Sequence, residues 1–389
     1  MIESESGPLK KFLRNKLDRY RAFASVIDSI STVRWVKFRW NWKARECEEY
    51  STFNSCLYYG QVVNHAIFLG VSIISYAWYF LQTDRINLGA AVSEVLIIIA
   101  IIYSSCYQIS TLRFAKDAEN HISQQDVLNR RFASIMSIPP SEHWCTGILY
   151  YFCLMCNMSR PCFGTFMYPY FLKEESPMNL YFRLGGQQFD PMHFLYALWS
   201  SYNIQIAYMI TNYYAILCLG HAYFYTFWLR SLVKTMKAKP TEDILKRAAK
   251  IFQMLRVQNI TCYHAYGRMI LPSVIVCASA WVTMSIVCLL RLYNQMDPLS
   301  LFIIMTAASQ AVCFLSLQFY SSHRMASDSM NFIEVFGKLK CSEPYWKSVV
   351  GSWSRLGFHV GGFYIISISD LQVWAEALIN QTMLCLSLF

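Results

Sequence analysis

Charged side chains are missing from long stretches of this chain, and their absence restricts its fold more than any motif does. No Asp, Glu, Lys or Arg occurs over the 36 residues between His193 and Arg230, nor between Met269 and Leu290. Each stretch exceeds the ~20 residues that a helix needs to cross a bilayer. Hydrophobic residues make up 55% of the 389 positions and charged residues only 15%, which excludes a soluble core with polar faces. A multi-spanning membrane protein is predicted.

We predict an all-α membrane protein with seven transmembrane helices. The expected spans are 60–81, 88–112, 144–171, 194–229, 269–290, 299–322 and 371–389. They divide the chain into a cytoplasmic N-terminal region (1–59), helices one to four (60–229), a cytoplasmic connection (230–268), helices five and six (269–322), a cytoplasmic anchor region (323–370) and a last helix (371–389). The first residues are too polar for a cleavable signal peptide, so the first span is expected to direct insertion.

The distribution of Lys and Arg predicts the orientation in the membrane. The N-terminal region and the connections 113–143, 230–268 and 323–358 together hold 29 of these residues, and the segments on the other side hold four. Basic loops stay in the cytoplasm, so we expect a cytoplasmic N-terminus and an extracellular C-terminus, opposite to a G-protein-coupled receptor. The net charge of +10 fits loops near anionic lipid and requires no nucleic-acid partner.

The last predicted span is unusually polar. Polar groups at this depth normally face water or a protein interior, and Ile379, Thr382, Leu386 and Phe389 share one helical face, with Glu376 one turn earlier. Hydrophobic constrictions gate channels by dewetting, and acidic rings attract cations. We therefore predict pore residues here: Leu386 and Phe389 at the gate, Ile379 on the same stripe, Thr382 on the wetted wall, and Glu376 or Asp370 in an inner vestibule. Alternatively, Glu376, Asn380 and Gln381 only bond neighbouring helices.

The layout and the closing segment, SEPYWKSVVGSWSRLGFHVGGFYIISISDLQVWAEALINQTMLCLSLF, resemble the insect odorant receptor family within the odorant/gustatory receptor superfamily. A Trp-containing helix, a basic turn, a small-residue break and a terminal helix follow in the family's order. The resemblance implies a ligand-gated, non-selective cation channel with four subunits around one pore, in the plasma membrane of a sensory neuron. The short 230–268 connection is similar to that of a ligand-tuning subunit, which assembles with a co-receptor into a heterotetramer. The gustatory-type homotetramer stays open as an alternative, although Thr382 is followed by Met383 where gustatory members carry Tyr.

An odorant site should be an aromatic-lined pocket with few polar groups, and the family places it in the outer half of the bundle. Fourteen residues of spans two, three, four and six are the expected ligand contacts, with ordinary helix packing as the competing interpretation. They are Val92, Val95, Leu96, Phe163, Phe166, Met167, Tyr202, Gln205, Ile206, Met209, Phe302, Met305, Thr306 and Ser309.

Three further signals bear on function. Arg160-Pro161 inside span three predicts either a functional charge or a kink with a snorkelling Arg. Cys153 and Cys156 have metal-type spacing without a second pair, so we expect no zinc site. Since no nucleophile–base or metal set converges in the sequence, we also expect no cofactor and no enzyme chemistry. In the cytoplasm, Thr241 should begin an amphipathic helix whose apolar face includes Leu245, Ala248, Ile251 and Leu255.

Overall fold

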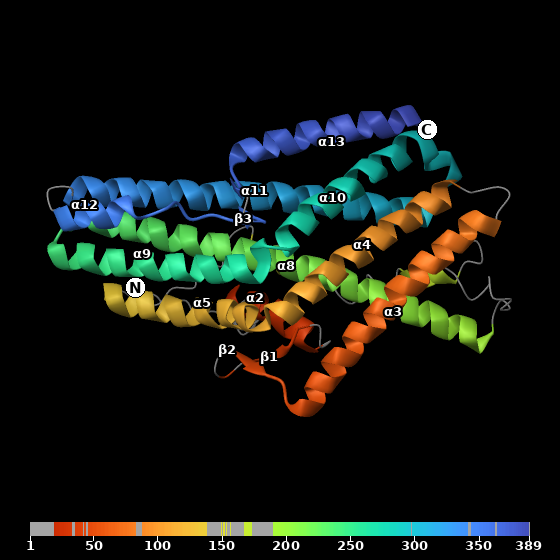
Figure 1. Ribbon diagram of the computed structural model, residues 1–389, viewed down its shortest axis with the longest axis horizontal. Helices are drawn as coiled ribbons and strands as arrows, with labels where there is room; N and C mark the ends of the chain where they lie inside the picture. The colour runs from red at the N-terminus through yellow and green to blue at the C-terminus, as the bar shows by residue number, and fades with distance from the viewer. Residues whose placement is uncertain are drawn as a thin grey trace, which may run out of the picture.

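The computed structural model describes residues 19–32, 36–41, 43, 46–82, 88–137, 149, 151, 153, 156, 167–172, 190–296, 298–340, 344–361 and 364–388. Most of them are helical (Figure 1). The main helices are α2 (Arg19–Thr32), α3 (Thr52–Gln82), α4 (Leu88–Arg113), α5 (Ala115–Met136), α8 (Pro191–Ala238), α9 (Glu242–Cys262), α10 (Ile270–Val287), α11 (Pro298–Lys340), α12 (Pro344–Gly351) and α13 (Ile368–Leu388). Two π-helices, η1 (Tyr263–Gly267) and η2 (Cys288–Leu292), flank α10.

The predicted all-α fold needs one correction, because two small antiparallel sheets are present. Strand β1 (Phe38–Asn41) pairs with β2 (Glu46–Glu49), and β3 (His359–Val360) pairs with β4 (Tyr364–Ile365). The second hairpin turns through Gly361, whose φ of 56° suits glycine. Its backbone N–H donates to the carbonyl of Gly267 at 2.9 Å, which ties the hairpin to η1.

Within the described part of the chain, four helices are long and apolar enough to cross a membrane: Thr52–Leu81, Glu94–Arg113, Ile270–Gln295 and Ser300–Leu339. They coincide with the predicted spans one, two, five and six. The predicted span 144–171 lies mostly outside the described residues, and Arg160 lies outside them entirely. Seven spans and their orientation therefore remain predictions.

Helix α11 extends much further than its predicted span, because its 43 residues continue to Lys340 without a break at 322. Its second half packs into a helical bundle with α8, α9 and α12 (Figure 1). There the rings of Phe252 and Phe332 stack with centroids 4.6 Å apart, and Trp353 packs on both. Burial of these aromatic rings stabilises the packing of the C-terminal half of α11 in the bundle.

Helix α9 begins as predicted. Thr241 is its N-cap, and the Thr241 hydroxyl accepts from the backbone N–H of Ile244 at 3.5 Å. The expected apolar face, including Leu245, Ala248 and Ile251, is buried against neighbouring helices.

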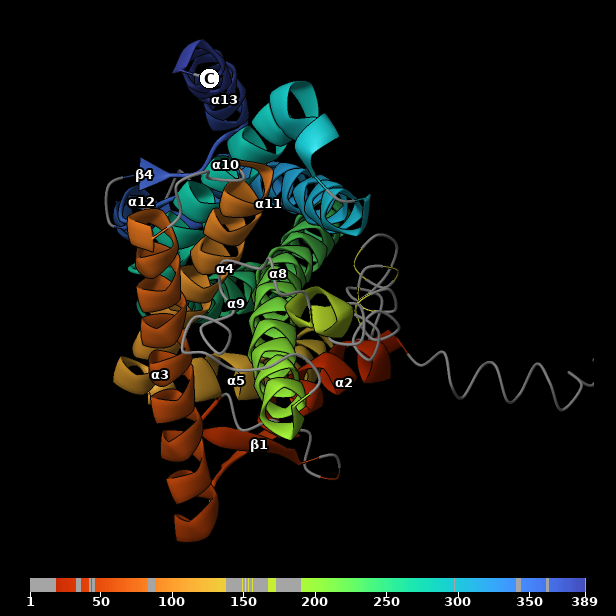
Figure 2. The same ribbon diagram turned by 90° about the vertical axis from the view of Figure 1, so that its right-hand side faces the viewer.

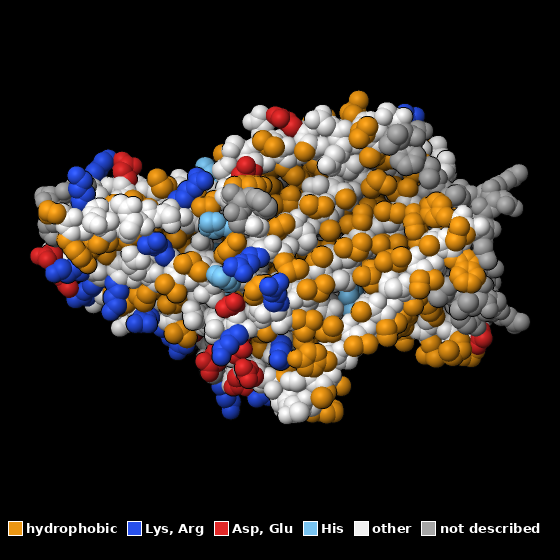
Figure 3. Space-filling model, in the orientation of Figure 1, with side chains coloured by type: hydrophobic (Ala, Val, Ile, Leu, Met, Phe, Trp, Pro, Cys, Tyr) orange, Lys and Arg blue, Asp and Glu red, His pale blue; other side chains and the backbone are white. Residues whose placement is uncertain are grey.

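The surface divides into two regions. Figure 3 shows hydrophobic side chains spread over one half of the molecule and Lys and Arg gathered at the opposite end. Exposed apolar residues of α3 illustrate the first region, with Val63 57% and Ile74 55% exposed. In water such exposure would be costly, whereas lipid is a matching solvent.

Candidate functional site

A cavity of about 150 Å³ lies between α4, α8, α10 and α11. Each of these four helices packs against two of the others, so that contacts run from α4 to α10, α10 to α11, α11 to α8 and α8 to α4 (Figure 2). The wall is formed by residues that repeat at helical spacing on each element, joined by Met167 and Tyr170. The wall residues are Leu96, Ile97, Ile99, Ala100 and Tyr103 of α4; Ile204, Ala207, Tyr208, Thr211, Asn212 and Ala215 of α8; Val274, Cys277, Ala278 and Trp281 of α10; and Ser300, Ile303, Ile304, Ala307, Gln310, Ala311 and Phe314 of α11.

Small residues explain why a cavity forms here. On α11, Ala307 and Ala311 lie one turn apart on the face that lines the cavity. On α8, Ala207 and Ala215 lie two turns apart on the corresponding face. Their short side chains leave space between the helices. The rings of Phe314 and Trp281 line this space. The result is a largely apolar chamber inside a helix bundle, which is a typical place for a small-molecule site.

Few polar groups line this chamber. The side-chain amide of Gln310 donates to the Tyr208 hydroxyl oxygen at 3.3 Å, which is long for a hydrogen bond and joins α11 to α8. The indole N–H of Trp281 and the hydroxyl of Tyr103 are buried without a hydrogen-bond partner among the described residues. Unpaired buried donors are uncommon and costly, so the wall holds hydrogen-bonding capacity that the described residues leave unused.

The structure brings two of the predicted ligand contacts, Leu96 and Met167, to the cavity wall. Phe163 and Phe166 lie outside the described residues. Val92 packs instead with Cys288 and Leu292, and Val95 is half-buried.

The predicted contacts on α8 and α11 lie on faces of these helices that do not line the cavity. Ile206 and Met209 belong to the large core, Gln205 is half-buried, and Tyr202 is exposed and donates to Gln61 at 3.2 Å. On α11, Phe302 is 63% exposed, Thr306 and Ser309 are exposed, and Met305 is half-buried. The residues that line the cavity are one or two positions along the sequence from the predicted contacts. On a helix this places them roughly 100–200° around the axis from the predicted contacts.

The whole α10 wall escaped prediction from sequence. The prediction favoured aromatic and Met positions, whereas the cavity follows small residues at heptad-like spacing. Ser300, Ala307 and Ala311 on α11 carried that signal.

Helix α13 is the second candidate element, and it lies along the outside of the bundle beside α10 (Figure 1). The indole N–H of Trp374 donates to the Ser279 hydroxyl at 2.7 Å near one end. Arg291 donates to the backbone carbonyl of Leu386 at 3.3 Å near the other. Between these two attachments most of the helix is exposed.

The structure places the predicted pore residues of α13 in different surroundings. Ile379 is 63% exposed and Thr382 only 7%, so these two do not share one exposed face. Glu376 is exposed and accepts from Gln372 at 3.0 Å, and Leu386 is half-buried. Asp370 accepts from the backbone N–H and hydroxyl of Ser367 at 2.5 and 2.9 Å, which caps the start of the helix. Phe389 lies outside the described residues.

An apolar chamber between long helices, continued by a polar helical bundle, defines a helical-bundle fold with membrane-compatible helices. The chain resembles the solved structure of the insect olfactory receptor OR5 from Machilis hrabei in complex with eugenol, with a TM-score of 0.67 at 12% identity over 97% of this chain and 99% of that one. A second structure of OR5 gives a TM-score of 0.64 at 11% identity, covering 96% of this chain and 100% of that one. No family model and no curated protein sequence matches. The predicted resemblance to insect odorant receptors is therefore confirmed, at the level of the fold.

Proposed function

We propose that this chain is a ligand-tuning subunit of an odorant-gated, non-selective cation channel. The likeness of fold to an insect olfactory receptor over nearly the whole chain supports this function, together with the apolar chamber. In this proposal the chamber binds a small volatile compound, and a co-receptor completes a heterotetramer in the plasma membrane.

The chamber suggests the chemistry of the ligand. A volume of about 150 Å³ suits a compound about the size of an aromatic ring with short substituents, and the largely apolar wall favours weakly polar molecules. A ligand hydroxyl or carbonyl would replace the long Gln310–Tyr208 bond or accept from Trp281. Eugenol, the compound bound in the OR5 structure, has these properties and is a rational first probe.

Helix α13 is the proposed wall of the pore. A single subunit leaves Glu376, Ile379, Asn380 and Leu384 exposed on it, as a helix that faces a shared axis should. Glu376 would attract cations there, and Ile379 and Leu386 would restrict hydration when the pore is closed. Thr382, which is buried against its own chain, contributes to the fit of the helix in this arrangement.

Paired substitutions on α11 test the ligand site. Membrane currents are recorded from cells expressing the chain with a co-receptor, over a panel of volatile compounds that includes eugenol. Ala307→Phe fills the chamber and is expected to raise the half-maximal ligand concentration at least tenfold. Ser309→Phe adds the same ring on the exposed face and should change it by less than about threefold, as surface substitutions do.

The outcomes separate the alternatives. Equal effects of the two substitutions would reject the chamber as the ligand site. Ligand-gated current from the chain alone would favour the gustatory-type homotetramer, and ligand responses that need a G protein and no pore would reject the channel.

A further inference from the structure

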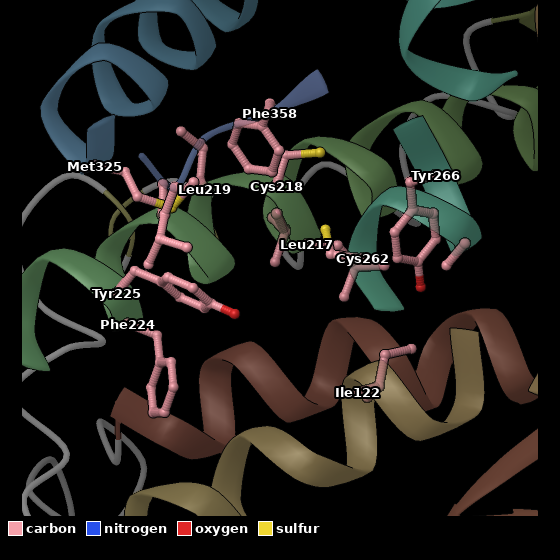
Figure 4. Packing of buried hydrophobic residues seen from close by; sticks show 14 of the residues in the cluster. Ile122, Leu217, Cys218, Leu219, Phe224, Tyr225, Cys262, Tyr266, Met325 and Phe358 are labelled. Carbon is pink, nitrogen blue, oxygen red and sulfur yellow. The ribbon is translucent and has the colours of Figure 1, made fainter. Parts of the chain in front are cut away.

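Two histidines and a cysteine meet where α5, α8 and α9 pack together. His121, His221 and Cys262 are 0%, 0% and 4% exposed, and one ligand atom from each lies within 4.8 Å of the other two. Figure 4 shows Cys262 on α9 with Ile122, the neighbour of His121, on the helix across from it. The cluster lies apart from the chamber, since none of its residues lines that wall.

Hydrogen bonds fix the orientation of the two rings. The Asn259 amide nitrogen donates to the carbonyl of Gly357 at 3.3 Å, so its oxygen faces Nε2 of His221, also at 3.3 Å. His221 therefore carries its proton on Nε2 and has a lone pair on Nδ1. That lone pair accepts from Nε2 of His121 at 2.8 Å. Nε2 of His121 and Nδ1 of His221 therefore face each other across this hydrogen bond.

We propose that His121 Nε2, His221 Nδ1 and Cys262 Sγ form a binding site for one soft monovalent metal ion, Cu(I). Thiolate and imidazole are ligands that copper prefers. Zinc takes four ligands in structural sites, and the cluster found among the described residues offers three. A thiolate with Cu(I) is also neutral, whereas a divalent ion would leave a buried net charge, which is costly.

Binding requires two proton movements. Cu(I) displaces the thiol proton of Cys262, which leaves to solvent, because the thiolate is the form that binds a metal. His121 binds as a neutral ring, and its proton moves from Nε2 to Nδ1 as the metal takes the lone pair of Nε2. No electron is transferred.

The ring pair opens slightly to admit the ion. Two bonds of about 2.0 Å in a trigonal arrangement separate the nitrogens by about 3.5 Å, against 2.8 Å in the hydrogen-bonded pair. A cavity of about 10 Å³ is lined by Cys262 and Asn259, so the thiol and the amide next to the rings have space to adjust. Asn259 keeps its bond to His221 and orients the ligand, as partners of metal-bound histidines do.

The experiment titrates the full-length protein in detergent, under reducing conditions, with Cu(I) buffered by a competing chelator. The wild type is expected to bind one tight equivalent that Cys262→Ser and His221→Gln lack. Cys288→Ser, which changes another fully buried cysteine remote from the cluster, is the matched control and should retain it. Asn259→Ala is expected to weaken binding about 10–100-fold.

X-ray absorption of the copper-loaded wild type provides a readout that does not depend on folding of the variants. The expected spectrum is three-coordinate Cu(I) with one sulfur and two nitrogen ligands. Sulfur-only coordination, or a full complement of Cu(I) in folded Cys262→Ser, would overturn the proposal. Tighter binding of Zn(II) than of Cu(I) at the same residues would overturn the choice of metal.

Discussion

At the scale of single residues, polar side chains in the apolar half of the molecule are used to join helices. Asn64 of α3 accepts from the indole N–H of Trp199 at 2.7 Å and donates to Asn203 at 3.0 Å, both on α8. Asn203 in turn donates to the Trp199 carbonyl at 2.9 Å. Lipid offers no replacement for these partners, so the network stabilises the contact between α3 and α8.

Removal of Asn64 tests this network. Asn64→Ala leaves the Trp199 indole N–H and the Asn203 side chain without this partner, and is expected to cost about 1–2 kcal/mol of stability. Tyr202→Phe, which removes an exposed bond to Gln61, should cost less than about 0.5 kcal/mol. The melting temperatures of the purified variants in detergent measure both, and equal values would contradict a structural role for Asn64.

At the scale of elements, α13 stands out because it packs on α10 and α11 and leaves most of its surface exposed. The Trp374–Ser279 hydrogen bond at 2.7 Å joins the side chains of α13 and α10. If α13 moves relative to α10, this bond has to break. The ring of Trp374 also lies 6.1 Å from that of Phe319 on α11. These contacts stabilise the arrangement described here, in which α13 lies against α10.

Loss of this bond is expected to favour channel opening. Trp374→Phe should raise ligand-free current about fivefold, which corresponds to about 1 kcal/mol for one hydrogen bond. Ser279→Ala should act in the same direction, and the double variant should be no stronger than either single variant because both remove one interaction. Recordings with the co-receptor present measure all three, with Ser387→Ala on exposed α13 surface as the control. Additive effects would show that the two residues act separately.

At the scale of the whole molecule, charge and hydrophobicity lie at opposite ends. Ion pairs such as Arg230–Asp328 and Lys246–Glu242, at 2.8 and 2.7 Å, lie in the polar helical bundle, where Lys and Arg gather in Figure 3. Basic residues of this kind belong on the cytoplasmic side. We therefore predict that the hydrophobic half, with the chamber inside it, lies in the membrane.

Surface labelling tests this orientation. An epitope fused to the N-terminus should be detected only after the cells are permeabilised, because the positive-inside rule predicts that the basic tail lies in the cytosol. An epitope fused after Phe389 should be detected on intact cells. The reverse pattern would reject the orientation and both channel functions with it.

Sequence reasoning located the helices better than it located their faces. Stretches with few or no charged residues predict membrane spans, because burial of charge in lipid is so costly. Helices α4, whose predicted span contains only Glu94, and α10 begin within one residue of the predicted spans. The face of each helix depends on packing partners that the sequence does not reveal. Ala307 and Ser309 are two residues apart, yet one lines the chamber and the other is exposed.

The uninterrupted α11 has a mechanical consequence. Its 43 residues form a rod roughly 65 Å long, with Ser300 and Ala307 at the chamber and Phe332 and Phe336 in the distant aromatic cluster. A tilt of about two degrees at one end shifts the other by about 2 Å over this length. Small adjustments around an occupant of the chamber can thus reach the remote bundle through leverage, without a hinge between them.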